Sequence, residues 1–289
     1  MQYRKLGNTP FDVSVLGMGC VTFGREIDEA ASVEILNHAL DQGMTLFDTA
    51  ESYGGGASEE LVGSWMESRG CRDEIVLASK VSGILTRNRI ISSAEESLRR
   101  LKTDRIDLFQ LHVWDDETPL TEMLAALDAL VRDGKVLEIG CSNYTKDQLE
   151  TARKLSDEGG LTKMKTVQPP YNLVQREIEI DLLPYCQEEG IGVISYSPLA
   201  AGFLTGKYRP GKSPPKGSRF DVIPGHQPIY FTNHGYDVLE QLDHRVMETG
   251  HTHAELAMQW TLQQSGITSV LVGARTTDHV DLAVNLLSK

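Results

Sequence analysis

The chain has 289 residues, 40% of them hydrophobic, which is enough to bury a large core as one barrel or as two smaller domains. Its formal net charge of -13 argues against nucleic acid or an anionic membrane as a partner, because both need a basic face. The four cysteines lie far apart without a Cys-x-x-Cys pair, so the sequence indicates neither a disulfide framework nor a zinc ribbon.

The N-terminus and the hydropathy pattern predict a cytoplasmic protein. Charged residues, Asn and Pro precede the first apolar run, which is unlike a secretory signal. Nowhere do about 18 apolar residues follow one another, so we expect no transmembrane helix.

From residue 15 onward, short apolar runs alternate with longer segments of helical period, a pattern typical of parallel βα units. Eight such units in a chain of this length favour a closed (β/α)8 TIM barrel over an open doubly wound sheet. We expect one barrel domain over residues 1–289. The predicted strands are residues 15–20, 45–49, 74–80, 106–112, 136–141, 166–169, 192–196 and 268–272.

Apolar stripes and capping signals place the helices between these strands. Residues 120–131 carry Leu, Met and Val at spacings of three and four, as expected of a helix that packs one face on a sheet. Thr145 precedes Gln148, and Ser92 precedes Glu95, at capping-box spacing. Glycines mark the expected helix ends at Gly43, Gly70, Gly134 and Gly190.

Three features qualify this pattern. An open dinucleotide-binding sheet would carry an early Gly-x-Gly-x-x-Gly fingerprint, and the nearest sequence, Gly17-Met18-Gly19, lacks the third glycine. Residues 1–14 are expected to form a hairpin that closes the bottom of the barrel. Residues 201–235, rich in Gly and Pro, are expected to form a long loop without a helical pattern after the seventh strand.

Ionisable side chains end three consecutive predicted strands, where barrel enzymes place their chemistry. These are Asp48, Lys80 and His112, and Tyr53 follows Asp48 in a glycine-rich loop. A buried Asp/Lys pair alone is often only a structural ion pair. Three ionisable residues at equivalent ends of adjacent strands, however, favour a functional site.

The four side chains suit proton donation to a nascent alkoxide. A phenol with a pKa of about 10 is a weak acid at neutral pH, so we expect the Lys80 ammonium to lower the pKa of Tyr53. Asp48 would hold Lys80 charged and oriented. Neutral His112 would hydrogen-bond the substrate oxygen.

The segment Asp48-Thr49-Ala50-Glu51-Ser52-Tyr53-Gly54, with Lys80 and His112 at later strand ends, resembles the aldo-keto reductase superfamily. The resemblance extends over nearly the whole chain. It implies hydride transfer from NAD(P)H to an aldehyde or ketone, with Tyr53 as proton donor. Further matching segments are Gly140-Cys141-Ser142-Asn143, Gln168-Pro169-Pro170-Tyr171-Asn172, Ser195-Tyr196-Ser197-Pro198-Leu199, Gly202-Phe203-Leu204-Thr205-Gly206-Lys207-Tyr208 and Gly273-Ala274-Arg275.

The same resemblance implies a set of cofactor contacts. Ser142, Asn143 and Gln168 would bind the nicotinamide carboxamide, and Tyr196 would stack on the ring. Taken without the resemblance, Ser142 and Asn143 could be a strand-to-helix turn and Tyr196 an ordinary core residue. The remaining implied contacts, along the pyrophosphate and at the adenosine end, are Ser197, Leu199, Gly202, Lys207, Arg219, Gly273 and Arg275.

The adenosine end departs from the family pattern. Similar proteins usually carry Gln, Glu and Asn near the start of the last helix, where this sequence has His279, Leu282 and Ala283. Arg275 suits planar recognition of a 2′-phosphate, so we expect NADPH/NADP+, with NADH as the alternative.

Phe23, Trp114 and Tyr230 are the expected apolar lining of the substrate site, although each could be plain packing. His251 and His253 lack a third ligand, so we expect no metal.

Two other functions fit parts of this pattern. Similar barrels serve as ancillary subunits of ion channels, so the chain could be a nicotinamide-nucleotide-binding sensor with little turnover. A metal-assisted lyase or hydrolase on the same fold is the third alternative, and the lack of a three-ligand constellation disfavours it.

Overall fold

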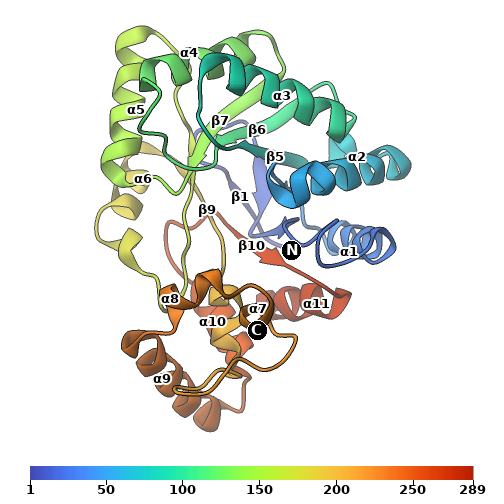
Figure 1. Cartoon of the computed structure of the whole chain (residues 1–289), viewed down its shortest axis with the longest axis vertical. Coiled ribbons are helices and arrows are strands. Elements are labelled where there is room, and N and C mark those ends of the chain that lie inside the picture. Colours follow the sequence, from blue (N-terminus) through green and yellow to red (C-terminus); the bar gives the residue numbers. More distant parts are fainter. Residues whose placement is uncertain (289) are drawn as a thin grey trace.

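The computed structural model describes residues 1–288, and eight parallel strands in it form a closed barrel (Figure 1). Lys289, the last residue of the expected domain, lies outside the described residues. Strand β10 pairs with β3, which closes the barrel. In chain order the strands are β3 (Leu16–Gly19), β4 (Leu46–Asp48), β5 (Val76–Val81), β6 (Ile106–Leu111), β7 (Val136–Ser142), β8 (Thr166–Gln168), β9 (Gly192–Ser195) and β10 (Ser269–Gly273).

All eight predicted strands are confirmed, with small differences at their ends. The largest lies before β5, where Glu74 belongs to a short 3-10 turn, Arg72–Glu74, instead of the strand.

Helices cover the outside of the barrel. The 120–131 stripe is confirmed by α4, in which Met123, Leu124, Leu127 and Leu130 are buried. The covering helices are α1 (Glu29–Asp41), α2 (Ala57–Arg69), α3 (Arg87–Leu101), α4 (Leu120–Arg132), α5 (Lys146–Gly159), α6 (Leu182–Glu189), α10 (His253–Leu262) and α11 (Thr277–Asn285).

The predicted helix ends are largely confirmed. Thr145 and Gln148 form the capping box of α5, and left-handed glycines follow or end α1, α2, α4 and α6. The capping box expected at Ser92 and Glu95 is wrong, because α3 begins one and a half turns earlier with Thr86 as its N-cap. Ser92 lies inside the helix and donates to the carbonyl of Arg89.

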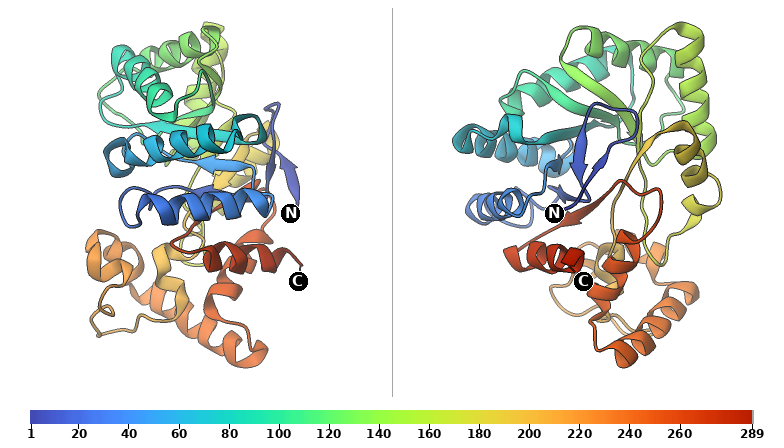
Figure 2. Two further views of the ribbon diagram at one scale, coloured as in Figure 1. Left: turned by 90° about the vertical axis from the view of Figure 1, so that its right-hand side faces the viewer. Right: turned by 180° about the vertical axis from the view of Figure 1, so that it is seen from behind.

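The N-terminal hairpin closes the bottom of the barrel, as predicted. Strands β1 (Tyr3–Lys5) and β2 (Asp12–Ser14) pair antiparallel and lie across one end of the barrel (Figure 2). Leu6 and Val13 are fully buried against a cluster from the barrel interior, formed by Leu46, Val76, Ala78, Leu108, Ile194 and Leu271.

The segment after β9 is not the helix-free loop that was expected. It contains a 3-10 helix, Ala200–Thr205, and the short helices α7 (Arg219–Val222) and α8 (Gln227–Tyr230), followed by α9 (Asn233–Thr249). These elements form the orange part of Figure 1 and bury a second core around Phe203, whose neighbours are mainly aromatic. Gly206 follows the 3-10 helix and Pro224 comes shortly after α7, and helices this short show no clear helical period in the sequence.

No helix within residues 1–288 is long and apolar enough to cross a membrane.

Candidate active site

The carboxyl ends of the strands bring the four predicted catalytic side chains together. Asp48 is the last residue of β4, Lys80 lies near the end of β5, and His112 directly follows β6. The Nζ atom of Lys80 lies 2.5 Å from Oδ2 of Asp48 and 3.3 Å from the Tyr53 hydroxyl. The Tyr53 and His112 rings meet edge to face, with centroids 5.8 Å apart.

The Asp48–Lys80 pair is almost completely removed from water. The two side chains are 2% and 0% exposed, so neither charge is screened by solvent. Lys80 also donates to the carbonyl of Thr49, and Asp48 accepts a second hydrogen bond from Gln168. Burial works to lower the pKa of Lys80, but the Asp48 carboxylate and Tyr53 outweigh it, so the pKa is raised and the ammonium persists at neutral pH.

The pKa of Tyr53 is raised above its ordinary value, which corrects our expectation. Burial is the largest influence and raises it, while the Lys80 ammonium lowers it as expected but only in part. Tyr53 therefore remains a protonated phenol in this state of the protein, with a positive charge next to the oxygen that would carry a negative charge after proton release.

His112 is held neutral. Burial, followed by repulsion from Lys80, lowers the pKa of its imidazole to about 4, although Glu51 acts in the opposite direction. A neutral ring has one N–H donor and one acceptor nitrogen, so its orientation decides which of them faces a substrate.

Four residues beside the catalytic candidates form a connected hydrogen-bond network. Asn143 donates to the carbonyl of His112 and accepts from the Tyr196 hydroxyl at 2.7 Å. Ser142 donates to the carbonyl of Gln168, and the Gln168 side chain donates to Asp48. The Gln168 side-chain carbonyl has no protein donor among the described hydrogen bonds, so it is available to an amide N–H from outside.

Left-handed backbone conformations occur at the ends of β7 and β9. Asn143 has φ 60° and Ser197 has φ 57°, followed by Ala200 and Ala201 with positive φ. Such conformations are costly for residues other than glycine and cluster at functional sites. Asn143 directly follows β7 and Ser197 lies two residues after β9, so both turns lie at the end of the barrel that holds Asp48 and His112.

Three cationic residues expected at the phosphate and adenosine end lie close together. Arg219 and Arg275 both bind the carboxylate of Glu26, which sequence reasoning had not singled out. Burial and the positive charge of Arg275 together lower the pKa of Lys207. His279 accepts a hydrogen bond from the backbone N–H of Arg275, so it caps the turn at this end.

The remaining predicted cofactor residues lie after β9 and at the end of β10. Ser197 and Leu199 precede the 3-10 helix, and Lys207 Nζ lies 3.8 Å from the position a Cβ on Gly202 would take. Gly202 also has φ +91°, which explains why a glycine stands there. Gly273 ends β10, and a Cβ there would meet open space.

Two of the three expected substrate-site residues are packing residues instead. Phe23 is fully buried in the main core, and Tyr230 is 4% exposed within the second core, where it donates to Gln175. Trp114 is half-buried, packs edge to face on Tyr144 and follows His112 by two residues, so it remains at the mouth.

Within residues 1–288 there is no group of three metal-ligating side chains. His253 instead binds Asp243 at 2.6 Å.

Known proteins resemble the chain along nearly its whole length. Residues 15–289 match the Aldo/keto reductase family. Aldo-keto reductase YhdN of Bacillus subtilis is 35% identical, covering 97% of this chain and 87% of that protein. Protein tas of Escherichia coli is 32% identical (99% and 93%), and a probable voltage-gated potassium channel subunit beta of Arabidopsis thaliana is 33% identical (97% and 89%). The chain is therefore an oxidoreductase-type barrel that belongs to the aldo/keto reductase family.

Proposed function

We propose that the protein reduces an aldehyde or ketone with NADPH, or oxidises the corresponding alcohol or sugar, with Tyr53 as the proton donor. The single observation that carries this proposal is the contact of the Tyr53 hydroxyl with a buried ammonium whose charge Asp48 holds. An isolated structural ion pair would have no need of a phenol as its third member.

Each of the four side chains has a separate role in protonating the carbonyl oxygen. The cofactor, when bound, supplies the hydride to the carbonyl carbon. Tyr53 donates its phenolic proton to the carbonyl oxygen, and Lys80 stabilises the phenolate that remains. Asp48 keeps Lys80 charged, and neutral His112 hydrogen-bonds the same oxygen and so orients the carbonyl.

Ser142, Asn143, Gln168 and Tyr196 would hold the nicotinamide, and Arg219 and Arg275 the adenosine end. The two guanidiniums already bind one carboxylate between them, so they lie close enough to bind one anionic group together, and arginine suits phosphate recognition. This favours NADPH over NADH. We further propose that residues 1–289 form one barrel domain that works in the cytoplasm.

The alternative function is a regulatory subunit that binds the nucleotide with little turnover. The name of the Arabidopsis relative, a channel subunit, favours it. Both functions use the same nucleotide site, so only the rate of chemistry separates them.

The test is the oxidation of NADPH, and then of NADH, followed by absorbance with the metal-free protein across aldehydes, ketones and sugars. Tyr53→Phe serves as the catalytic control, because it removes the donated proton and leaves the ring in place. Clear turnover with the natural chain, lost by at least about a hundredfold in Tyr53→Phe while cofactor affinity stays, supports the reductase. Tight binding of NADPH without turnover supports the regulatory subunit, and full turnover by Tyr53→Phe contradicts the role of Tyr53.

A further inference from the structure

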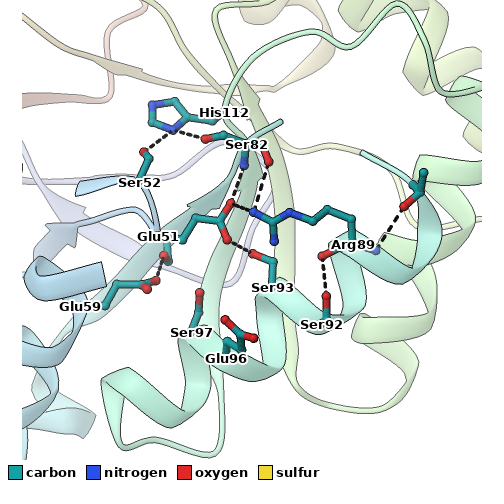
Figure 3. Close-up of polar contacts among 12 residues, drawn as sticks. Glu51, Ser52, Glu59, Ser82, Arg89, Ser92, Ser93, Glu96, Ser97 and His112 are labelled. Carbon is teal, nitrogen blue, oxygen red and sulfur yellow. Dashed lines mark hydrogen bonds and ion pairs between the residues drawn. The ribbon is translucent and has the colours of Figure 1, made fainter. Parts of the chain in front are cut away.

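Two hydroxyl groups converge on one nitrogen of the His112 ring (Figure 3). The Oγ atom of Ser82 lies 3.2 Å from Nδ1, and the Oγ atom of Ser52 lies 3.4 Å from the same atom. The ring's other nitrogen, Nε2, has no partner among the described hydrogen bonds. The two nitrogens of His112 therefore have different surroundings, one of them engaged by protein and the other open.

The other contacts of the two serines favour one direction for these hydrogen bonds. Neither serine hydroxyl has a carbonyl or carboxylate acceptor among the described hydrogen bonds, so the ring nitrogen is the protein atom that can take its proton. If Nδ1 carried the ring proton instead, both hydroxyls would lose that acceptor. Because the ring is neutral, an accepting Nδ1 requires the ring proton to sit on Nε2.

Ser82 is held in place by a brace on its backbone. One carboxylate oxygen of Glu51 accepts the N–H of Ser82 at 2.9 Å and also binds the Arg89 guanidinium. The same guanidinium donates to the carbonyl of Ser82, so both backbone groups of that residue are engaged. The second oxygen of Glu51 accepts from Ser93 at 2.6 Å, which ties the carboxylate to α3.

Ser52 is the weaker of the two donors. Its side chain is exposed, its distance to Nδ1 is longer, and no side chain braces it in the way that Glu51 and Arg89 hold Ser82. The charged groups facing the ring are Lys80, which repels an imidazolium, and Glu51, which attracts one but is neutralised by Arg89.

We propose that Ser82, braced by Glu51 and Arg89, is a positioning residue that fixes His112 as the tautomer with its proton on Nε2. In this tautomer the open nitrogen is a donor and can hydrogen-bond a carbonyl oxygen. In the other tautomer it would be an acceptor and would repel that oxygen. The proposal deepens the proposed function, since it concerns how the site orients the carbonyl.

The direct test is NMR of the protein labelled with 15N in its histidine rings, without substrate. Two-bond and three-bond 15N–1H correlations distinguish a protonated from an unprotonated ring nitrogen, and His112→Asn assigns the signals. We expect His112 to show a protonated Nε2 and an unprotonated Nδ1 at neutral pH. A protonated Nδ1, or an equal mixture of tautomers, in the natural chain overturns the proposal, whether or not the protein turns over any substrate.

Ser82→Ala then tests the residue itself. It removes the hydroxyl and leaves the backbone contacts with Glu51 and Arg89 available. We expect the Nδ1 signal to shift toward a mixture of tautomers and kcat/KM for carbonyl reduction to fall about tenfold, the value of one hydrogen bond, while the Kd for NADPH is unchanged. Ser82→Thr, which keeps a hydroxyl, should restore both readouts.

The matched control is Ser92→Ala, on α3 but with its hydroxyl on the carbonyl of Arg89 and no contact with His112. It should change neither the ring signals nor kcat/KM. If Ser82→Ala leaves the tautomer unchanged, the positioning role is wrong. A correct tautomer response in a protein without turnover would instead contradict the proposed reductase and leave the positioning role intact.

Discussion

At the scale of single residues, Asp48 connects the parts of the site. Its two carboxylate oxygens receive different donors, Lys80 on one and Gln168 on the other. The first contact holds the lysine beside the proposed proton donor, and the second joins that lysine to the residues proposed to hold the nicotinamide. One buried carboxylate thus couples the two halves of the site.

Removing the Asp48 charge should destabilise the fold as well as the chemistry. Asp48→Asn leaves the fully buried Lys80 without its counter-charge, so the free energy of unfolding should fall by about 3–5 kcal/mol. Urea unfolding followed by circular dichroism measures this. Asp73→Asn, which removes an exposed carboxylate paired with the partly buried Arg105, is the control and should cost much less. Equal losses in both variants would contradict the burial argument.

The lowered pKa of His112 predicts how the site responds to acid. The unfolded chain binds a proton on this ring near pH 6.5, whereas the folded chain does so only at about 4. Stability from this group is therefore full above pH 6.5 and decreases as the pH falls toward 4, because the unfolded state gains the proton first. A pH titration of the ring by NMR should show no ionisation between 5.5 and 8. A midpoint near 6.5 would contradict the burial of this ring.

At the scale of elements, the loop before α1 reaches across to α7 and to the turn before α11. Glu26 makes this connection, since it binds Arg219 on α7 and Arg275 after β10. Burial and the adjacent arginines have opposite effects on Glu26, and the arginines prevail, so the pKa of this carboxyl is lowered and it stays ionised. A phosphate that binds the two arginines must compete with this carboxylate.

Neutralising Glu26 should therefore strengthen binding of NADPH. We expect Glu26→Gln to lower the Kd for NADPH about two- to fivefold, the value of a partly exposed ion pair, and to leave the Kd for NADH nearly unchanged. Fluorescence titration of the substrate-free protein measures both constants. Glu29→Gln, an exposed neighbour at the start of α1, is the control. An equal effect on the two nucleotides would place the 2′-phosphate elsewhere.

At the scale of the whole molecule, the sequence was enough to predict the barrel and the meeting of the four candidate catalytic side chains at one end of it. Short apolar runs and the polar residues that end them can be read from neighbouring residues alone, which is why Asp48, Lys80 and His112 could be located. Contacts between distant segments have no such signal. Glu26 lies 193 residues from Arg219 in the sequence. The hydrogen bond from Ser82 to Glu51 likewise depends on how the loop after β4 packs against the loop after β5. Glu51 and Ser52 lie within the segment Asp48–Gly54 that resembles the aldo-keto reductases, and nothing else in the sequence pointed to a role for them.

The two ends of the barrel differ, with the candidate active site at the carboxyl ends of the strands and the N-terminal hairpin at the opposite end. Gly7 lies in the hairpin with φ +53°, and a Cβ there would be 2.3 Å from the backbone nitrogen of Gly192 in β9. Gly7→Ala should therefore lower the free energy of unfolding by about 2–4 kcal/mol, from the clash and the positive φ together. Gly134 has φ +73°, but a Cβ there would meet open space. Gly134→Ala should therefore lower the free energy of unfolding only through the positive φ, by about 1–2 kcal/mol.

Because the hairpin is remote from the site, kcat/KM per folded molecule should be the same in both variants and the natural chain at 25 °C. Thermal unfolding and steady-state kinetics on one preparation give the two quantities. If Gly7→Ala lowered kcat/KM without lowering stability, the bottom of the barrel would have to be part of the catalytic machinery, and the division of roles between the two ends would be wrong.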